Sequence, residues 1–315
     1  MPQTIALCAL VLSSFSGSPA RAADPAAAAV PAPTSVTTVG TLRVEKYGSG
    51  SPAMIFIPGL SSGSWVWRDA VTHYAGTHAV YLVTLAGFDG LPSTGAGIDG
   101  ADASLLQLIT TEKLKRPIVV GHSLGGYLAL RFGTEHASLV RGIVAVDGLP
   151  ILPQYLQTPA ADRIAAGDKL AAQIGASTPE QYAAGQKMIL ASMITSPADV
   201  DRVAALSAKS DPKAVAIYYD QIIRDDLRPA LPKLTVPTLE IAPVPTEPAP
   251  YEGPQAQNAS LTDRAAGYKA FYGTLFPGAP NVTVETVLNS KHFAMIDQPK
   301  ALYDDITAFV ATLPA

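Results

Sequence analysis

Residues 117–126, PIVVGHSLGG, place a serine between two glycines in the spacing G-x-S-x-G. The apolar run before the serine predicts a buried strand, and the apolar residues after it recur at helical spacing. A turn this sharp would lift the hydroxyl of Ser123 out of the end of a sheet, and Gly121 and Gly125 would leave room for close packing. The segment therefore predicts a nucleophilic serine. A purely structural turn is the alternative.

A serine hydroxyl becomes a good nucleophile only when a base takes its proton, which calls for a histidine. Five are available: His73, His78, His122, His136 and His292. His122 adjoins Ser123, but adjacent side chains diverge at a tight turn. His292 follows the last predicted strand and precedes a predicted C-terminal helix. The order of serine before histidine favours His292 as the base.

Negative charge that develops on an attacked carbonyl group needs two N–H donors, which together form an oxyanion hole. The backbone N–H of Leu124 would supply one at the start of the predicted helix. Leu60, in the segment PGLSSG at residues 58–63, would supply the other. A plain Pro-Gly turn is the alternative for this segment.

The elements that must position these residues alternate between short apolar runs and longer helical patterns, which is typical of a mostly parallel sheet. Strands are expected at 53–57, 79–85, 117–121, 142–146, 238–242 and 282–287, after an antiparallel hairpin at 37–47. Helices are expected at 103–111, 124–136 and 302–312. Residues 151–231 contain no convincing strand and have helical patterns at 181–195, 198–208 and 212–226. They predict a helical cap inserted into a core of residues 36–150 and 232–315.

Three segments, GHSLGG, FIPGLSSGSW and SKHFAMIDQP, stand in an order that resembles the α/β-hydrolase superfamily. The resemblance covers residues 36–314. It implies an α/β-hydrolase fold with a helical cap and an esterase-like or lipase-like serine hydrolase that requires no cofactor. Many members have His-Gly where this chain has Pro58-Gly59, so the hydrogen bonds of that histidine are absent here.

The resemblance also calls for a carboxylate that orients His292 and stabilises its charged form. Family members usually place it after the strand that follows the cap, where this chain has no aspartate. Glu240 is expected within that strand, and Glu247 lies in the proline-rich loop behind it. Some members carry the acid one strand earlier, where Asp147 stands. We therefore expect Asp147 to be the acid, with Glu247 as the alternative; Asp89, in a second copy of the string DGLP, is expected to be a turn residue.

Apolar side chains near these segments could line a pocket for an acyl or aromatic group. The candidates are Trp65, Met188 and Met193, although such residues more often belong to a core. The chain shows no metal cluster, phosphate loop or nucleotide fingerprint, so neither a metal nor a cofactor is expected.

The first 22 residues resemble a secretory signal, with an apolar run from Ile5 to Leu12 and Ala20-Arg21-Ala22 as a cleavage site. The segment lacks a basic residue at its start, and a disordered N-terminus is the alternative. Residues 23–35 are rich in alanine and proline and predict a linker. A periplasmic or secreted protein is expected, with no stable membrane insertion once the signal is removed.

The charge balance of 22 Lys+Arg against 26 Asp+Glu, with charged residues at 15% of the chain, argues against a nucleic-acid partner. The expected activity is cleavage of a carboxylic ester of a small molecule through an acyl-enzyme. Lactone, amide and C–C bond hydrolysis use the same residues, and a non-catalytic binding protein is an alternative of another class. The sequence leaves the oligomeric state open.

Overall fold

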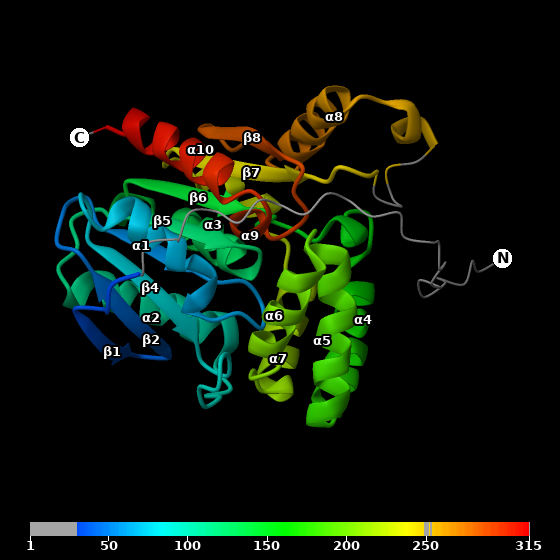
Figure 1. The fold of residues 1–315 in the computed structure, drawn as a ribbon, viewed down its shortest axis with the longest axis horizontal. Coiled ribbons are helices and arrows are strands. Elements are labelled where there is room, and N and C mark those ends of the chain that lie inside the picture. The colour runs from blue at the N-terminus through cyan, green and yellow to red at the C-terminus, as the bar shows by residue number, and fades with distance from the viewer. Residues whose placement is uncertain (1–29, 249–251, 253, 315) are drawn as a thin grey trace.

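A computed structural model describes residues 30–248, 252 and 254–314. The expected signal peptide and most of the expected linker lie outside these residues. The described residues form one eight-stranded sheet in the order β1-β2-β4-β3-β5-β6-β7-β8 (Figure 1). The strands are β1 Ser35–Val39, β2 Leu42–Tyr47, β3 Met54–Ile57, β4 Val80–Leu85, β5 Ile118–His122, β6 Gly142–Val146, β7 Thr238–Val244 and β8 Val282–Leu288.

The first two strands run antiparallel and the other six run parallel to one another, as the sequence pattern predicts. Strands β3 to β6 are buried at every position, which explains their continuous apolar runs. Because the carboxyl ends of parallel strands share one edge of the sheet, the segments after β3, β5, β6 and β8 are brought close together.

Helices cover both faces of this sheet and bury two large apolar clusters against it. One face packs against α1 Arg68–Tyr74, α9 Ala294–Asp297 and α10 Pro299–Thr312, and the other against α2 Gly97–Thr111, α3 Leu124–Glu135 and α8 Leu261–Thr274. The mostly parallel sheet with helices on both faces confirms the predicted α/β-hydrolase architecture. Helix α8 was not predicted because few of its positions are buried.

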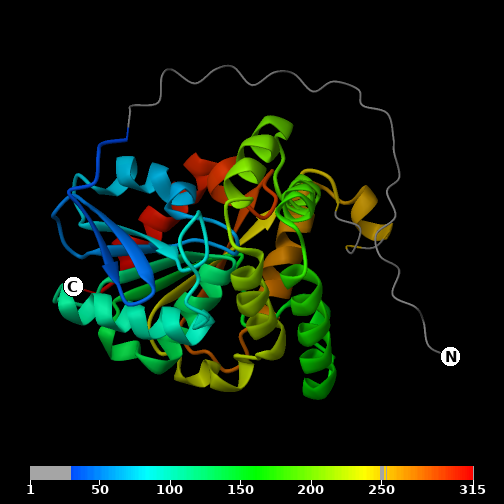
Figure 2. The same cartoon turned by 90° about the horizontal axis from the view of Figure 1, so that it is seen from below.

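Between β6 and β7 the chain forms α4 Ala160–Gly175, α5 Pro179–Met193, α6 Pro197–Ser207 and α7 Pro212–Arg224, called here the helical insert. Figures 1 and 2 show these helices grouped together beside the sheet. Three of them match the expected helices. Helix α4 was not predicted, and only Arg163 and Gly167 of its residues are buried. None of the described helices is both long and apolar enough to span a membrane.

Candidate active site

Ser123 stands in the turn between β5 and α3, with backbone angles φ 53° and ψ −117°. This conformation is strained for a residue with a side chain, and such strain is typical of functional turns. Neighbouring positions tolerate only glycine: a Cβ on Gly121 would lie 2.0 Å from the carbonyl oxygen of Gly125, and one on Gly125 would lie 2.3 Å from that of Ile57. The turn thus has the geometry that the G-x-S-x-G spacing predicts.

The carboxylate of Asp147 directly follows β6 and contacts the imidazole of His292, which follows β8. The distance between Oδ2 of Asp147 and Nδ1 of His292 is 2.5 Å. With Nδ1 donating to the carboxylate, Nε2 of His292 keeps its lone pair and can accept a proton. The structure therefore brings together the two residues expected to act as base and acid.

Tyr272 on α8 donates its hydroxyl to the other oxygen of Asp147, Oδ1, at 2.5 Å. Burial alone would raise the pKa of Asp147, but the charge of His292 and hydrogen bonds from His292 and Tyr272 outweigh it, so the pKa lies below its usual range. Asp147 is thus ionised at neutral pH. Glu247, the alternative acid, is exposed in the loop after β7, where its backbone carbonyl accepts from Arg264.

Residues 289–297, which follow β8 and carry His292, are called here the histidine loop. His122 is fully buried and links β5 to this loop. Its Nε2 donates to the backbone carbonyl of His292 at 3.0 Å, because a carbonyl oxygen can only accept. Burial, and the proximity of His292, lower the pKa of His122 well below its ordinary value. His122 is therefore neutral and structural, which agrees with its predicted exclusion as the base.

The loop after β3 packs directly on the turn that carries Ser123. A Cβ on Gly59 would lie 3.1 Å from Cβ of Ser123, so the neighbouring Leu60 is close to the serine. Leu124 is the first residue of α3, where backbone N–H groups have no partner within the helix. Both residues expected to form an oxyanion hole thus flank Ser123.

Buried polar contacts that the sequence analysis missed hold this loop in place. Ser64 donates its hydroxyl to the buried Glu45 at 2.7 Å, and its backbone N–H donates to Thr84 Oγ1 at 2.9 Å. Ser61 shares a hydrogen bond of 2.7 Å with the hydroxyl of Tyr182 on α5. Glu45 stands in a strand that also holds Arg43 and Lys46, so its sequence gives no signal that would have suggested this buried role.

The helical insert also contacts the histidine loop on either side of His292. Lys291 Nζ donates to the carbonyl oxygens of Ala191 and Ile194, each at 3.1 Å. Asp297 accepts from the backbone N–H and the hydroxyl of Thr195, both at 2.9 Å, and from the backbone N–H of Lys291 at 2.8 Å. The insert and the histidine loop are thereby fastened together.

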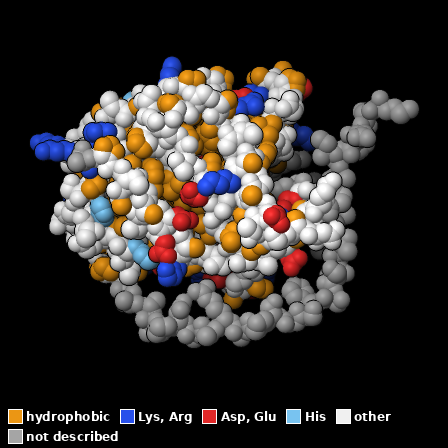
Figure 3. Space-filling model, turned by 90° about the horizontal axis from the view of Figure 1, so that it is seen from above, with side chains coloured by type: hydrophobic (Ala, Val, Ile, Leu, Met, Phe, Trp, Pro, Cys, Tyr) orange, Lys and Arg blue, Asp and Glu red, His pale blue; other side chains and the backbone are white. Residues whose placement is uncertain are grey.

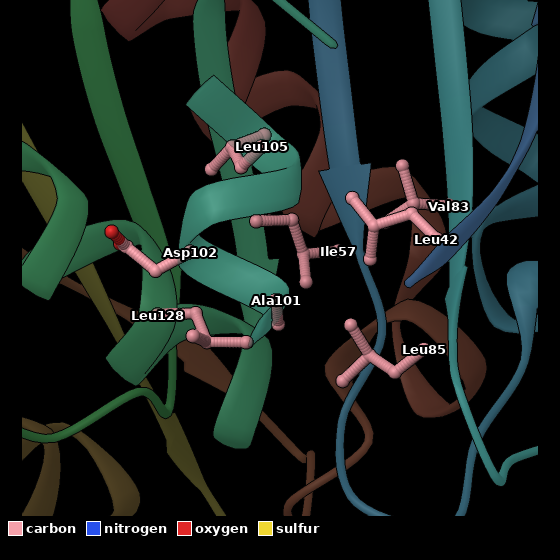
Figure 4. A pocket seen from close by; sticks show the side chains of 8 residues that line it. All are labelled: Leu42, Ile57, Val83, Leu85, Ala101, Asp102, Leu105 and Leu128. Carbon is pink, nitrogen blue, oxygen red and sulfur yellow. The ribbon is translucent and has the colours of Figure 1, made fainter. Parts of the chain in front are cut away.

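The expected pocket residues occupy different environments. Trp65, in the short helix Ser64–Trp67, and Met193, at the end of α5, are partly buried and pack against the apolar cluster on the α1 and α10 face. Met188 is 66% exposed on α5. Their roles as pocket residues stay predictions. A separate small apolar cavity between the sheet and α2 is lined by Asp102 and by none of the expected site residues (Figure 4).

Asp102, Glu135 and His136 offer ligand atoms that lie within 4.8 Å of one another, the one such group among the described residues. Arg131 already pairs with Glu135 at 3.3 Å, and its positive charge would compete with a cation. The group is therefore a poor metal site.

A family model described as "Alpha/beta hydrolase family" matches residues 54–305, most of the chain. The chain belongs to the alpha/beta hydrolase family. Its match includes β3, the serine turn, the helical insert and the histidine loop, so every expected site residue lies within the alpha/beta hydrolase region.

Individual relatives agree with this assignment. A 2-(acetamidomethylene)succinate hydrolase from Mesorhizobium japonicum is 28% identical over 86% of this chain and 91% of its own length. An esterase structure from Thermogutta terrifontis covers 88% of this chain and 98% of its own, with a TM-score of 0.68 and 16% identity. An enol-lactonase structure from Burkholderia xenovorans covers 88% of this chain and 100% of its own, with a TM-score of 0.64 and 16% identity. The family match and the relative from Mesorhizobium japonicum support a hydrolase, and the two solved structures agree with the alpha/beta hydrolase fold.

Proposed function

We propose that this protein is a serine hydrolase that cleaves a carboxylic ester of a small molecule through an acyl-enzyme. The observation that supports it most directly is the contact between Asp147 and His292. The backbone carbonyl of His292 also accepts from His122, the residue before the strained Ser123. A carboxylate on Nδ1 selects the imidazole form whose Nε2 can take a proton from a hydroxyl group.

In the proposed reaction Ser123 attacks the ester carbonyl while His292 takes the hydroxyl proton. The backbone N–H groups of Leu60 and Leu124 stabilise the negative charge that develops on the carbonyl oxygen. His292 then gives its proton to the departing alcohol, which leaves an acyl group on Ser123. A water molecule, activated by His292, releases the acid and restores the free serine.

A fluorophosphonate, which reacts with activated serine hydroxyls, tests the proposal. We expect stoichiometric labelling of the wild type and of Ser192→Ala, an exposed serine on α5, and no labelling of Ser123→Ala. A folded wild type that remains unlabelled would contradict the proposal and favour a non-catalytic binding protein.

The same probe applied to cell fractions checks the proposed export, which predicts labelled protein without residues 1–22 in the periplasmic or secreted fraction.

The relatives' names span ester, enol-lactone and acetamidomethylenesuccinate hydrolysis. All of these reactions can use one nucleophile, one base and one oxyanion hole, so the site chemistry does not separate them. A panel of aryl esters, lactones and anilides with matched acyl groups would rank them. We expect esters to give the highest kcat/KM, because their leaving group needs the least help from a proton donor.

A further inference from the structure

A second carboxyl group lies beside Asp147 and has no part in the proposed reaction. Glu240 is in the middle of β7, is 0% exposed, and is paired in register with Ala145 of β6. The next residue in this row, Gly121, is also small. Two small residues beside it leave room for a long side chain on this face of the sheet.

Glu240 contacts the turn that carries Asp147. The backbone N–H of Gly148 donates to Oε1 of Glu240 at 3.3 Å. On its other side Gly148 packs against α3, where a Cβ would lie 2.4 Å from Cα of Gly126. The turn is thus held between the helix that follows Ser123 and the carboxyl group of Glu240.

The turn needs such support because Asp147 has a backbone φ of 49°, which is unfavourable for a residue other than glycine. The backbone N–H of Asp147 donates to the carbonyl of Ile241 at 2.9 Å, which fixes the start of the turn. The contact between Gly148 and Glu240 fixes the next peptide unit. Together they set the direction in which the Asp147 carboxylate leaves the sheet.

We propose that Glu240 is a positioning residue whose buried carboxyl group accepts from Gly148 and so holds Asp147 against His292. This inference rests on the proposed function. Glu240 does this in its protonated form, in which one oxygen still accepts a hydrogen bond and no second negative charge competes with Asp147.

The charges around the two carboxyl groups agree with a protonated Glu240 and an ionised Asp147. Burial first, and then the charge of Asp147, raise the pKa of Glu240 well above its ordinary value. The groups facing Asp147 are Glu240 from β7, Tyr272 from α8, His122 from β5 and His292. Of these, His292 is the one that develops positive charge in the proposed reaction, so Asp147 is the carboxyl group that must be ionised.

Substitutions at Glu240 separate this role from a general effect on folding. Glu240→Gln keeps an oxygen acceptor in a neutral side chain of the same shape, and we expect kcat within about twofold of the wild type. Glu240→Leu keeps the volume but removes the acceptor, and we expect kcat to fall about tenfold or more with KM little changed. Thr238→Val, a buried change in the same strand, is the matched control.

The pH profile gives a readout that a structural role would not move. In Glu240→Leu we expect the acid limb of kcat/KM to shift to lower pH, because a displaced Asp147 no longer favours the protonated imidazole. Melting temperatures should stay similar. The substitution removes one buried oxygen, Oε2, that has no hydrogen-bond partner among the described residues, and it leaves the N–H of Gly148 unpaired. If Glu240→Leu does not fold, the flexible Glu240→Met serves in its place.

Normal kcat and an unchanged pH profile in both apolar variants would overturn the inference, as would equal losses in Glu240→Gln and Glu240→Leu. Failure of the proposed function is distinguishable, because it would appear as a wild type that the fluorophosphonate does not label.

Discussion

Asp147 is held at both of its oxygens, one by His292 and the other by Tyr272. Two contacts fix the plane of the carboxylate as well as its position, so the imidazole meets it in one orientation. Hydrogen bonds to a charged group contribute about 1.5–3 kcal/mol each. The low pKa of Asp147 follows from the same contacts and keeps the group ionised at neutral pH.

Removing the charge of Asp147 should therefore act on turnover. We expect Asp147→Asn to lower kcat on a short aryl ester by about 10³- to 10⁴-fold, because the amide favours the wrong imidazole form. The exposed Glu247→Gln is the matched control and should stay near the wild type. Steady-state kinetics with circular dichroism as a folding check would decide, and the reverse pattern would move the acid to Glu247.

Residues near the serine differ in how far the sequence predicts them. The spacing around Ser123 is a local signal, and the serine stands in the strand-to-helix turn that this spacing predicts. His292 was expected from its place after the last strand, and it follows β8. Asp147 could be expected from the resemblance to members of the α/β-hydrolase superfamily that carry the acid after this strand. Tyr272 could not, because it meets Asp147 from a helix 125 positions away, and nothing in its own segment indicates that contact.

At the scale of elements, the helix ends carry sequence signals that apolar periodicity alone does not use. Helices α5, α6 and α7 each begin with a capping residue followed by proline: Thr178, Ser196 and Asp211 precede them. Helix α4 lacks a side-chain cap, and it was missed. Its packing against α7 is a tertiary contact that the local sequence does not encode.

The contact between the helical insert and the histidine loop predicts that the insert affects turnover from a distance. Asp297→Ala removes the carboxylate that accepts two hydrogen bonds from Thr195 of the insert and one from Lys291 of the histidine loop. We expect kcat to fall several-fold, KM to rise, and limited proteolysis to cut the α5–α6 connection faster. Asp304→Ala, on the exposed face of α10, is the control. Unchanged kinetics and proteolysis in Asp297→Ala would show that the loop holds its position without the insert.

At the scale of the whole molecule, a nearly neutral and sparsely charged surface encloses a core on both faces of the sheet. Figure 3 shows acidic and basic side chains scattered among uncharged atoms on one face. With 15% charged residues, the fold depends mainly on apolar burial. A buried charge within this core therefore has a clear effect on stability, and Asp102 is such a group.

Asp102 is 8% exposed, its Oδ1 has no hydrogen-bond partner among the described residues, and its carboxylate points away from Ile57 and Val83 in Figure 4. Burial first, and then the charge of Glu135, raise its pKa from 3.8 to about 6. The folded state thus holds a proton that the unfolded chain has already lost. This contribution to stability is complete below pH 4 or so and disappears as the pH rises to about 6.

The Asp102→Asn side chain stays neutral at every pH, so this variant should not lose stability as the pH rises through about 6. We expect its free energy of unfolding to exceed that of the wild type by about 1–2 kcal/mol more at pH 8 than at pH 5. Urea unfolding at pH 5 and at pH 8, with a chelator present, measures this difference in the free energy of unfolding. Asp99→Asn removes a neighbouring charge that is 74% exposed, and it should change stability almost equally at the two values. An equal change in stability for Asp102→Asn at pH 5 and pH 8 would contradict a raised pKa of Asp102 in the folded protein.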